Sequence, residues 1–458
     1  ASAPSAEAQS KGPPPLVSAS SLSLIVVADL MLKQCFKRAG LVFPASLAGM
    51  VALFAAGFVG LEKVAPKSTE NIVGMLEPGS ALLASRWLPV FFVPTLVILP
   101  LSPTPSRATA LRLLVIVFGG WFLSLASTAA VVSALSKGGA PAAAGDDAVN
   151  PAAAIALKPA GVFRKKLVGA LGIGALVAGA TSVITFGSGR TLLGFSVSKL
   201  ALPTRQLSLM LATLFGFSAG TQMPTRVRKA VHPVVTCTAV AMITAAVIGR
   251  GCAVGFADML RSYVTKSRCP VHLGAGDLLL GLLGPSVLSF AVQMYRRREL
   301  IFKNAKPVAG GSFFCATSGL FGTAVASRLI GLPNALRLAT LSRNITSPLA
   351  MAICSMLGAD TSFAIAIVVV TGVIGANFGA TALDALGVKD PAARGLAQGG
   401  SAHGLGTAAM VNEPTAFAFS AVAMAFTATA STVLVSIPAV RSALLTIALG
   451  ASWAVPIP

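Results

Sequence analysis

The chain has 458 residues, of which 55% are hydrophobic and 11% are charged, and its mean hydropathy is +0.82. This composition excludes a water-soluble globular domain and predicts a protein that contacts membrane lipid. The net charge of +21 lies in short Lys and Arg clusters between apolar runs. Because no basic stripe with interleaved aromatic residues accompanies these clusters, we expect no nucleic-acid partner.

The N-terminal part of the chain predicts a tail followed by a membrane domain. Residues 1–15 are rich in Ala, Ser and Pro, which predicts a disordered tail. The apolar segments that follow are each long enough to cross about 30 Å of hydrocarbon. They lie at 16–36, 41–61, 81–101 and 110–135. The sequence therefore predicts a four-helix membrane domain at 16–136.

A segment rich in Ala, Gly and Pro at 137–163 has no amphipathic period and predicts a linker. Beyond it, residues 164–458 carry ten further apolar segments and predict a second membrane domain. Two of these segments, 336–357 and 391–412, are too polar and too interrupted to be simple spans. We therefore predict an all-α polytopic membrane protein with about twelve transmembrane helices and at least one re-entrant segment.

Proline interrupts the second domain at Gly284-Pro285, Ser347-Pro348 and Glu413-Pro414. Proline cannot continue a helix from the preceding residue, but it suits the first turn of a new helix. Each step therefore predicts a new helix, and at the second step Thr346 or Ser347 would cap it. Many secondary transporters hold anionic substrates between the amino ends of such broken helices. For a single break, a proline kink between packed helices is the favoured explanation. Three breaks accompanied by Arg343 and His403 instead favour a substrate site.

Arg343 and Asn344 lie directly before the second break. A charged side chain at mid-bilayer costs about 2.5–3.5 kcal/mol, so Arg343 needs a partner or water. A guanidinium binds a carboxylate through two parallel hydrogen bonds. We therefore predict that Arg343, Asn344, Thr346 and Ser347 bind an anionic substrate. The alternative for Arg343 is that its side chain reaches the membrane interface.

The run DPAARGLAQGGSAHGLGTAAMVNE at 390–413 places glycine-rich, polar backbone between apolar helices. Such backbone at membrane depth usually lines a solute path. A neutral imidazole can bind a hydroxyl or carry a proton, although a structural histidine is the alternative for His403. The substrate-binding residues predicted from this run are Gln398, Ser401, His403 and Thr407.

Two further polar residues are candidates. Glu413 ends the glycine-rich run and is the candidate for proton coupling, with capping of the helix at Pro414 as the alternative. Asn377 projects from an apolar segment and is a weaker candidate for substrate binding, because nearby glycines suggest helix packing. The sequence contains no GxSxG, Walker or HExxH motif and no CxxC pair, so we expect neither an enzyme nor a cofactor or metal.

Several motifs carry a family resemblance. TSPLAMAI, VVVTGVIGANF, DPAARGLAQGGSAHGLGTA and SAVAMAFT resemble LrgB (CidB-like) membrane proteins, from about Arg164 to the C-terminus. FPASLAGM and RWLPVFFVP in the first domain resemble the partner LrgA (CidA-like). Fusion of both halves, together with GSAHGLGTAA and SIPAVRSALL, is similar to the plastidal glycolate/glycerate translocator family.

The resemblance implies a secondary transporter of small 2-hydroxycarboxylates, a multi-pass protein of the chloroplast inner envelope. It would exchange glycolate for glycerate in photorespiration, or couple their transport to protons. For such a carrier we expect inverted repeats in the C-terminal half and a possible homodimer. The alternative is a holin-like membrane permeability modulator or channel, since bacterial relatives are described in this way.

Overall fold

The computed structural model describes residues 15–41, 43–83, 87–91, 93–136, 164–187, 191–192, 195–224, 227–228, 231–265, 267 and 272–450. The tail predicted at 1–15 lies outside the described residues except for Pro15, which begins the first helix. The linker predicted at 137–163 lies entirely outside them.

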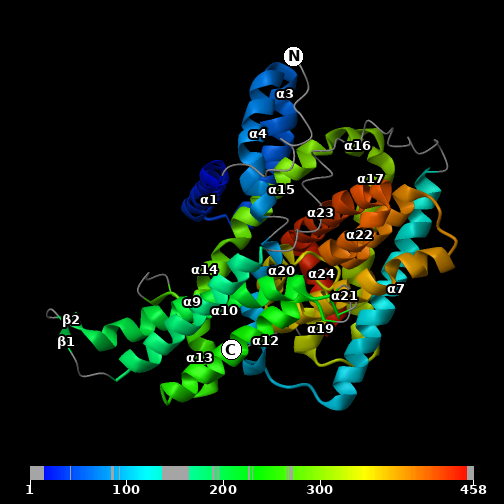
Figure 1. The fold of residues 1–458 in the computed structure, drawn as a ribbon. Helices are drawn as coiled ribbons and strands as arrows, with labels where there is room; N and C mark the ends of the chain where they lie inside the picture. Colours follow the sequence, from blue (N-terminus) through cyan, green and yellow to red (C-terminus); the bar gives the residue numbers. More distant parts are fainter. Residues whose placement is uncertain are drawn as a thin grey trace. The chain divides into compact units, whose positions relative to one another are not determined.

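The described part of the chain is built from helices (Figure 1), apart from one small hairpin. Strands β1 (Thr191–Leu192) and β2 (Phe195–Ser196) form this antiparallel hairpin. Within the described ranges, 10 helices are long and apolar enough to cross a membrane, and two shorter apolar helices lie at Ser347–Leu357 and Pro438–Leu449. The prediction of an all-α polytopic membrane protein is confirmed.

The described residues fall into two compact units. The first unit takes its described residues from 1–88 and from 282–298. Its helices are α1 (Pro15–Arg38), α2 (Ala45–Ala52), the π-helix η1 (Leu53–Gly60), α3 (Leu61–Val64), α4 (Pro66–Ala81) and α15 (Leu283–Arg296). Helix α15 contacts α1, α2 and α4 and is therefore an integral member of this unit.

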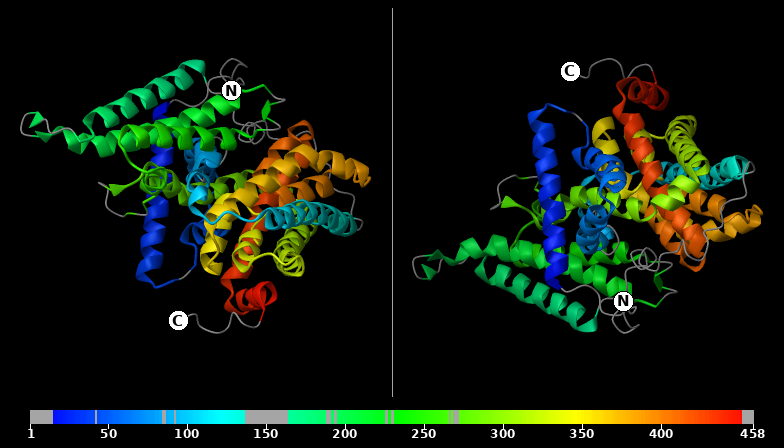
Figure 2. Two further views of the ribbon diagram at one scale, coloured as in Figure 1. Left: turned by 90° about the horizontal axis from the view of Figure 1, so that it is seen from below. Right: turned by 90° about the horizontal axis from the view of Figure 1, so that it is seen from above.

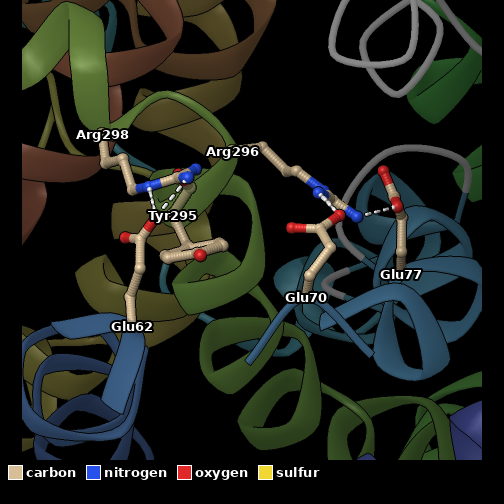
Figure 3. A network of polar contacts seen from close by, with 6 residues as sticks. All are labelled: Glu62, Glu70, Glu77, Tyr295, Arg296 and Arg298. Atoms are coloured by element: carbon tan, nitrogen blue, oxygen red, sulfur yellow. Dashed lines mark hydrogen bonds and ion pairs between the residues drawn. The ribbon is translucent and has the colours of Figure 1, made fainter. Parts of the chain in front are cut away.

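Ion pairs tie α15 to the first unit (Figure 3). The Arg296 guanidinium binds Glu70 at 2.5 Å and Glu77 at 2.7 Å, both on α4. Arg298, just beyond the end of α15, binds Glu62 of α3 at 2.5 Å. The acidic residues of the N-terminal helices therefore neutralise two arginines from a distant part of the sequence.

The second unit takes its described residues from 89–136, 164–281 and 299–450. Its first helices are α5 (Leu88–Phe91), α6 (Val93–Val97), the 3-10 helix η3 (Leu99–Leu101), α7 (Arg107–Ser136), α9 (Lys165–Thr185), the 3-10 helix η5 (Val197–Leu200), α10 (Ala201–Gln222), α12 (Pro233–Gly251), α13 (Phe256–Tyr263) and α14 (Ala275–Gly281). They continue with α16 (Arg298–Lys303), α17 (Ala305–Thr317), the π-helix η7 (Ser318–Gly322), α18 (Thr323–Leu329), α19 (Asn334–Thr340), α20 (Ser347–Leu357), α21 (Thr361–Ala385), α22 (Pro391–Ala409), the 3-10 helix η8 (Met410–Asn412), α23 (Pro414–Ser436) and α24 (Pro438–Leu449).

The span predicted at 81–101 stays a prediction, because residues 84–86 and 92 of this stretch lie outside the described residues. The described residues of this stretch form only the short helices α5, α6 and η3 after the end of α4.

The compact units divide the chain differently from the domains predicted at 16–136 and 164–458. Helix α7 precedes the predicted linker, yet it lies in the second unit and packs on α17, α21 and α22. Helix α15 follows the linker, yet it lies in the first unit. The predicted domains remain a description of sequence modules, whereas the units describe how the helices pack.

The second unit packs around α22. This helix contacts α7, α17, α21 and α23, and Trp121 and Leu125 of α7 form a buried apolar cluster with Ala397 and Ala402 of α22. In the same unit, α10 lies beside α9 and α12, as both views of Figure 2 show. The glycine-rich helix α22 is thus enclosed by neighbouring helices, and its polar residues lie inside the unit.

Candidate functional site

The predicted helix break before Pro348 is present. Helix α19 ends at Thr340, α20 begins at Ser347, and the residues between them are buried without forming a continuous helix. The predicted side-chain cap was wrong, because the Thr346 side chain makes no capping hydrogen bond. Its Oγ1 is instead buried without a hydrogen-bond partner. The break therefore places unpaired polar groups inside the unit.

Arg343 lies in this break and is only 2% exposed. Its Nε donates a hydrogen bond to Thr323 Oγ1 at 3.0 Å, and its Nη2 donates to Ser124 Oγ at 2.8 Å. Nη1 is buried without a partner. Within the described part of the chain, no carboxylate forms an ion pair with Arg343. Two neutral hydroxyls orient the guanidinium but leave its charge uncompensated.

A cavity of about 420 Å³ adjoins the Arg343 side chain. Helix α7 contributes Gly119, Gly120 and Ser124 to its wall, and the π-helix η7 contributes Ser318. The lining contains no acidic residue. Short π-helical turns inside α-helices are frequent at functional sites. Most of the lining is apolar, and it includes the exposed Val115 and Leu123 of α7. The cavity therefore offers a small anion one uncompensated cation and a few hydroxyls on an otherwise apolar wall.

Glycine at position 120 makes room for the guanidinium. A methyl group at Gly120 would lie 2.7 Å from Arg343 Nε, whereas one at Gly119 would meet nothing within 4 Å. Because real Cβ contacts are longer than 3.0 Å, any larger residue at position 120 would displace Arg343 or the helix. The position of α7 and the position of the arginine are therefore linked.

Asn344 connects the break to α22. Its Nδ2 donates to the carbonyl oxygen of Gly400 at 3.1 Å, while its Oδ1 is buried without a partner. Gly319 in η7 provides the space for this amide, because a methyl group there would lie 2.7 Å from Nδ2. The break at 341–346 therefore meets the glycine-rich helix three residues before His403.

Helix α22 is itself broken at His403. This residue has φ 43° and ψ −142°, a backbone conformation that is not helical and that side chains other than glycine rarely adopt. Such strain costs about 1–3 kcal/mol and concentrates at functional sites. The ring lies against Gly372, and Nε2 lies 2.9 Å from the carbonyl oxygen of Val368. The carbonyl oxygen of His403 accepts a hydrogen bond from Thr407 Oγ1 at 2.9 Å.

The remaining predicted residues of α22 are buried. Gln398 Nε2 donates to the carbonyl oxygens of Gly375 at 2.8 Å and Gly406 at 3.2 Å, while its Oε1 has no partner. Ser401 Oγ is also buried without a partner. Both breaks therefore carry unpaired polar atoms, which are costly in an apolar interior unless they serve a ligand or water.

Two predicted residues lie elsewhere. Asn377 is exposed on α21 and donates to the carbonyl oxygen of Val373 at 2.9 Å. Glu413 binds Arg394 through both carboxylate oxygens, at 2.6 and 2.8 Å, and makes no capping hydrogen bond to α23. Arg394 also donates to Asp384 at 2.7 Å. These three charged groups line a separate, open cavity of about 560 Å³.

The predictions missed the side chains that hold Arg343. Ser124 and Gly120 lie on α7, which the sequence placed in another domain, and Thr323 begins α18. The adjacent Gly119 and Gly120 in an otherwise apolar helix were the available signal. Small residues in membrane helices usually indicate helix packing, so this signal alone does not identify a site.

Comparisons with known proteins place the chain among membrane proteins of one family. Residues 213–440 match the LrgB-like family. The chain is 36% identical to plastidal glycolate/glycerate translocator 1, chloroplastic, of Arabidopsis thaliana, over 93% of this chain and 80% of that protein. An uncharacterized protein of Haemophilus influenzae is 26% identical over 48% of this chain and 90% of its own length.

A shorter match joins the chain to a second bacterial protein. The uncharacterized protein YxaC of Bacillus subtilis is 29% identical over 30% of this chain, which spans 59% of YxaC. No solved structure matches the chain. The identity to the Arabidopsis protein covers nearly the whole chain, including both helix breaks and α7. The chain therefore belongs to the family of the plastidal glycolate/glycerate translocator and contains an LrgB-like region.

Proposed function

We propose that this protein is a secondary transporter, not an enzyme, that exchanges glycolate for glycerate across the chloroplast inner envelope. The similarity to the Arabidopsis translocator supports the substrate class and the organelle. The structural observation that carries the proposal is Arg343, a buried guanidinium without a carboxylate partner beside a cavity of about 420 Å³. A volume of this size is typical of pockets that bind small molecules.

The chemistry of both acids fits this arrangement. Glycolate and glycerate share a carboxylate and a 2-hydroxyl group and differ by one CHOH unit. In the proposal, Arg343 Nη1 and Nη2 bind the carboxylate, and Ser124 yields its hydrogen bond to Nη2 when substrate arrives. Asn344 and Ser401 have unpaired buried oxygens that can accept a hydrogen bond from the hydroxyl group. Acids without that hydroxyl would leave these oxygens unpaired, which gives strong discrimination.

The two broken helices supply the moving parts in this proposal. Residues 341–346 and the kink at His403 meet through the hydrogen bond between Asn344 and Gly400. Broken helices of this kind allow alternating access to a site near the middle of the bilayer. Thr346, Ser347, Gln398 and Thr407 remain proposed contributors to the same site, and Glu413 remains the proposed proton-coupling group.

An exchange assay tests the function. Purified protein in proteoliposomes should take up radiolabelled glycolate in a saturable manner, and internal glycerate should accelerate this uptake. A holin-like pore would instead leak without a counter-substrate and would not saturate. Non-saturable uptake that ignores internal glycerate would therefore overturn the carrier proposal.

A variant tests the role of Arg343. Arg343→Ala should abolish uptake of both acids, because it removes the only cation among the residues that line the described cavity. Arg441→Ala serves as a control for the loss of one arginine on α24, away from the cavity lining. Uptake by a correctly folded Arg343→Ala protein at the wild-type rate would refute the assignment.

A further inference from the structure

Three consecutive arginines, Arg296 to Arg298, lie where α15 ends and α16 begins. Among the described residues, two of them have carboxylate partners. Arg296 binds both Glu70 and Glu77, and Arg298 binds Glu62 (Figure 3). Arg297 lies between them and is 8% exposed. In the described residues it forms no ion pair, and its Nη1 donates only to the carbonyl oxygen of Gln293 at 3.0 Å. The ion pairs of the first unit therefore leave Arg297 uncompensated.

The surroundings of Arg297 contain two further unpaired donors. Within the described part of the chain, Gln293 Nε2 and Arg296 Nε are both buried without a hydrogen-bond partner. Both residues line one cleft of the first unit together with Arg297. Glu77 also lines the cleft, but its Oε2 already binds Arg296 at 2.7 Å. The unsatisfied groups of the cleft are donors, so the missing partner is an acceptor.

The size of the cleft limits what enters it. Its enclosed space is about 10 Å³, which is about the room of one water-sized group. A single anionic oxygen fits this space, while the rest of its group stays at the mouth. Burial lowers the pKa of Arg297 to about 10, which leaves the side chain charged near neutral pH. The donors can therefore hold an oxygen that carries negative charge.

We propose that Gln293, Arg296 and Arg297 bind a phosphate group through one of its oxygens. Arg297 directly follows the candidate membrane span Ala275–Arg296, so the cleft lies at a membrane-proximal end of this span. Basic pockets at such positions bind the head groups of anionic lipids. The same donors would accept free inorganic phosphate, and the experiment distinguishes the two sources.

Thermal unfolding of the full-length protein in nanodiscs tests the proposal. One arm compares phosphatidylcholine nanodiscs with nanodiscs that also contain phosphatidylglycerol. The other arm keeps phosphatidylcholine and compares potassium phosphate with potassium chloride at equal ionic strength. We expect phosphatidylglycerol to raise the unfolding temperature of the wild type. Stabilisation by inorganic phosphate instead would identify the soluble anion as the source.

The variants decide whether the effect arises in this cleft. Arg297→Gln should raise the half-saturating concentration of the stabilising anion about tenfold, because it removes a charge-assisted hydrogen bond. Lys306→Gln removes one positive charge from an exposed site on α17 and should behave like the wild type. No stabilisation in either arm, or equal stabilisation in Arg297→Gln, would overturn the proposal.

A second variant covers the case in which Arg297→Gln does not fold. Gln293→Leu keeps a similar side-chain volume and removes the unpaired amide donor. We expect a smaller increase, about fivefold, since a neutral donor contributes less than a charged one. A Gln293→Leu protein with unchanged phosphate and lipid responses would count against the site.

Discussion

Arg343 and Arg394 are both buried arginines of the second unit, but they have opposite surroundings. Arg394 binds the carboxylates of Glu413 and Asp384 and the carbonyl oxygen of Val388. Arg343 binds two neutral hydroxyls and retains an unpaired nitrogen. The region around Arg394 is an ion-pair cluster whose charges neutralise one another. The region around Arg343 has hydrogen-bond partners but no counter-ion among the described residues.

The difference separates a structural role from a binding role. A buried charge without a counter-ion is costly. At Arg394 the carboxylates of Glu413 and Asp384 compensate the charge. At Arg343 the cost remains, although the surrounding hydroxyls hold the side chain in place. A negatively charged substrate would supply the missing partner, so the account assigns substrate binding to Arg343 and stabilisation of the helix ends to Arg394.

The largest expected effect comes from Arg343→Met. Exchange of glycolate and glycerate should fall by more than about a hundredfold, because the carboxylate loses its charged partner. The unfolding temperature should not fall, because methionine removes an uncompensated charge and keeps most of the side-chain volume. Transport and thermal unfolding are measured on the same preparation. A lower unfolding temperature of Arg343→Met would show that Arg343 stabilises the fold as Arg394 does, which would contradict this account.

Arg394→Met should show the reverse pattern. The change leaves Glu413 and Asp384 without their shared cation, and we expect a loss of about 1–3 kcal/mol in the free energy of unfolding. Denaturant titration in detergent measures this loss. Adding Glu413→Gln and Asp384→Asn should restore part of the stability, since the uncompensated charges disappear. A fully stable Arg394→Met protein would show that the ion pairs contribute little.

Gly120→Ala tests the position of Arg343, because the added methyl group would displace its guanidinium. The added methyl group would press on the guanidinium, and exchange should fall about tenfold. Gly169→Ala is the control, because Gly169 is exposed on α9, away from the cavity lining, and its methyl group would meet nothing within 4 Å. Transport kinetics of both variants are the measurement. Equal exchange rates in the two variants would show that the packing of α7 against Arg343 does not affect transport.

Gly319→Ala applies the same test to Asn344 with a smaller expected effect. A methyl group there would lie 2.7 Å from Asn344 Nδ2, whereas one at the exposed Gly169 of α9 would meet nothing within 4 Å. We expect Gly319→Ala to raise the KM for glycerate about threefold to fivefold, because the amide can shift without loss of the arginine. Gly169→Ala should retain the wild-type KM. An unchanged KM in both variants would remove Asn344 from substrate recognition.

Glu413→Gln tests whether Glu413 couples proton binding to transport. Of all the variants, it should change the exchange rate at the optimal pH the least. If proton binding to Glu413 controls its contact with Arg394, the neutral variant should flatten the pH dependence of exchange without abolishing it. Initial exchange rates across a pH series provide the measurement. The same pH profile in wild type and variant would leave Glu413 with only its ion-pair role.

The parts of this molecule that follow local rules were visible in the sequence. Composition predicts the membrane class, and Pro348 predicts the start of α20, because proline restricts the backbone before it. The glycine-rich run around His403 predicts a broken helix, and α22 is kinked at that residue. Each of these features depends on a few neighbouring residues.

The missed features depend on packing between distant segments. Ser124 lies 219 residues before Arg343, and no local pattern indicates that their side chains meet. Glu413 was expected to couple protons or cap α23, but its partner Arg394 becomes apparent only when α22 folds back beside it.

A structure determined with bound glycerate tests the central claim most directly. The account predicts that the glycerate carboxylate lies within hydrogen-bonding distance of Arg343 Nη1, in the cavity lined by α7 and η7. Glycerate bound against Arg394 in the open cavity beside Glu413, with the Arg343 cavity unoccupied, would contradict it.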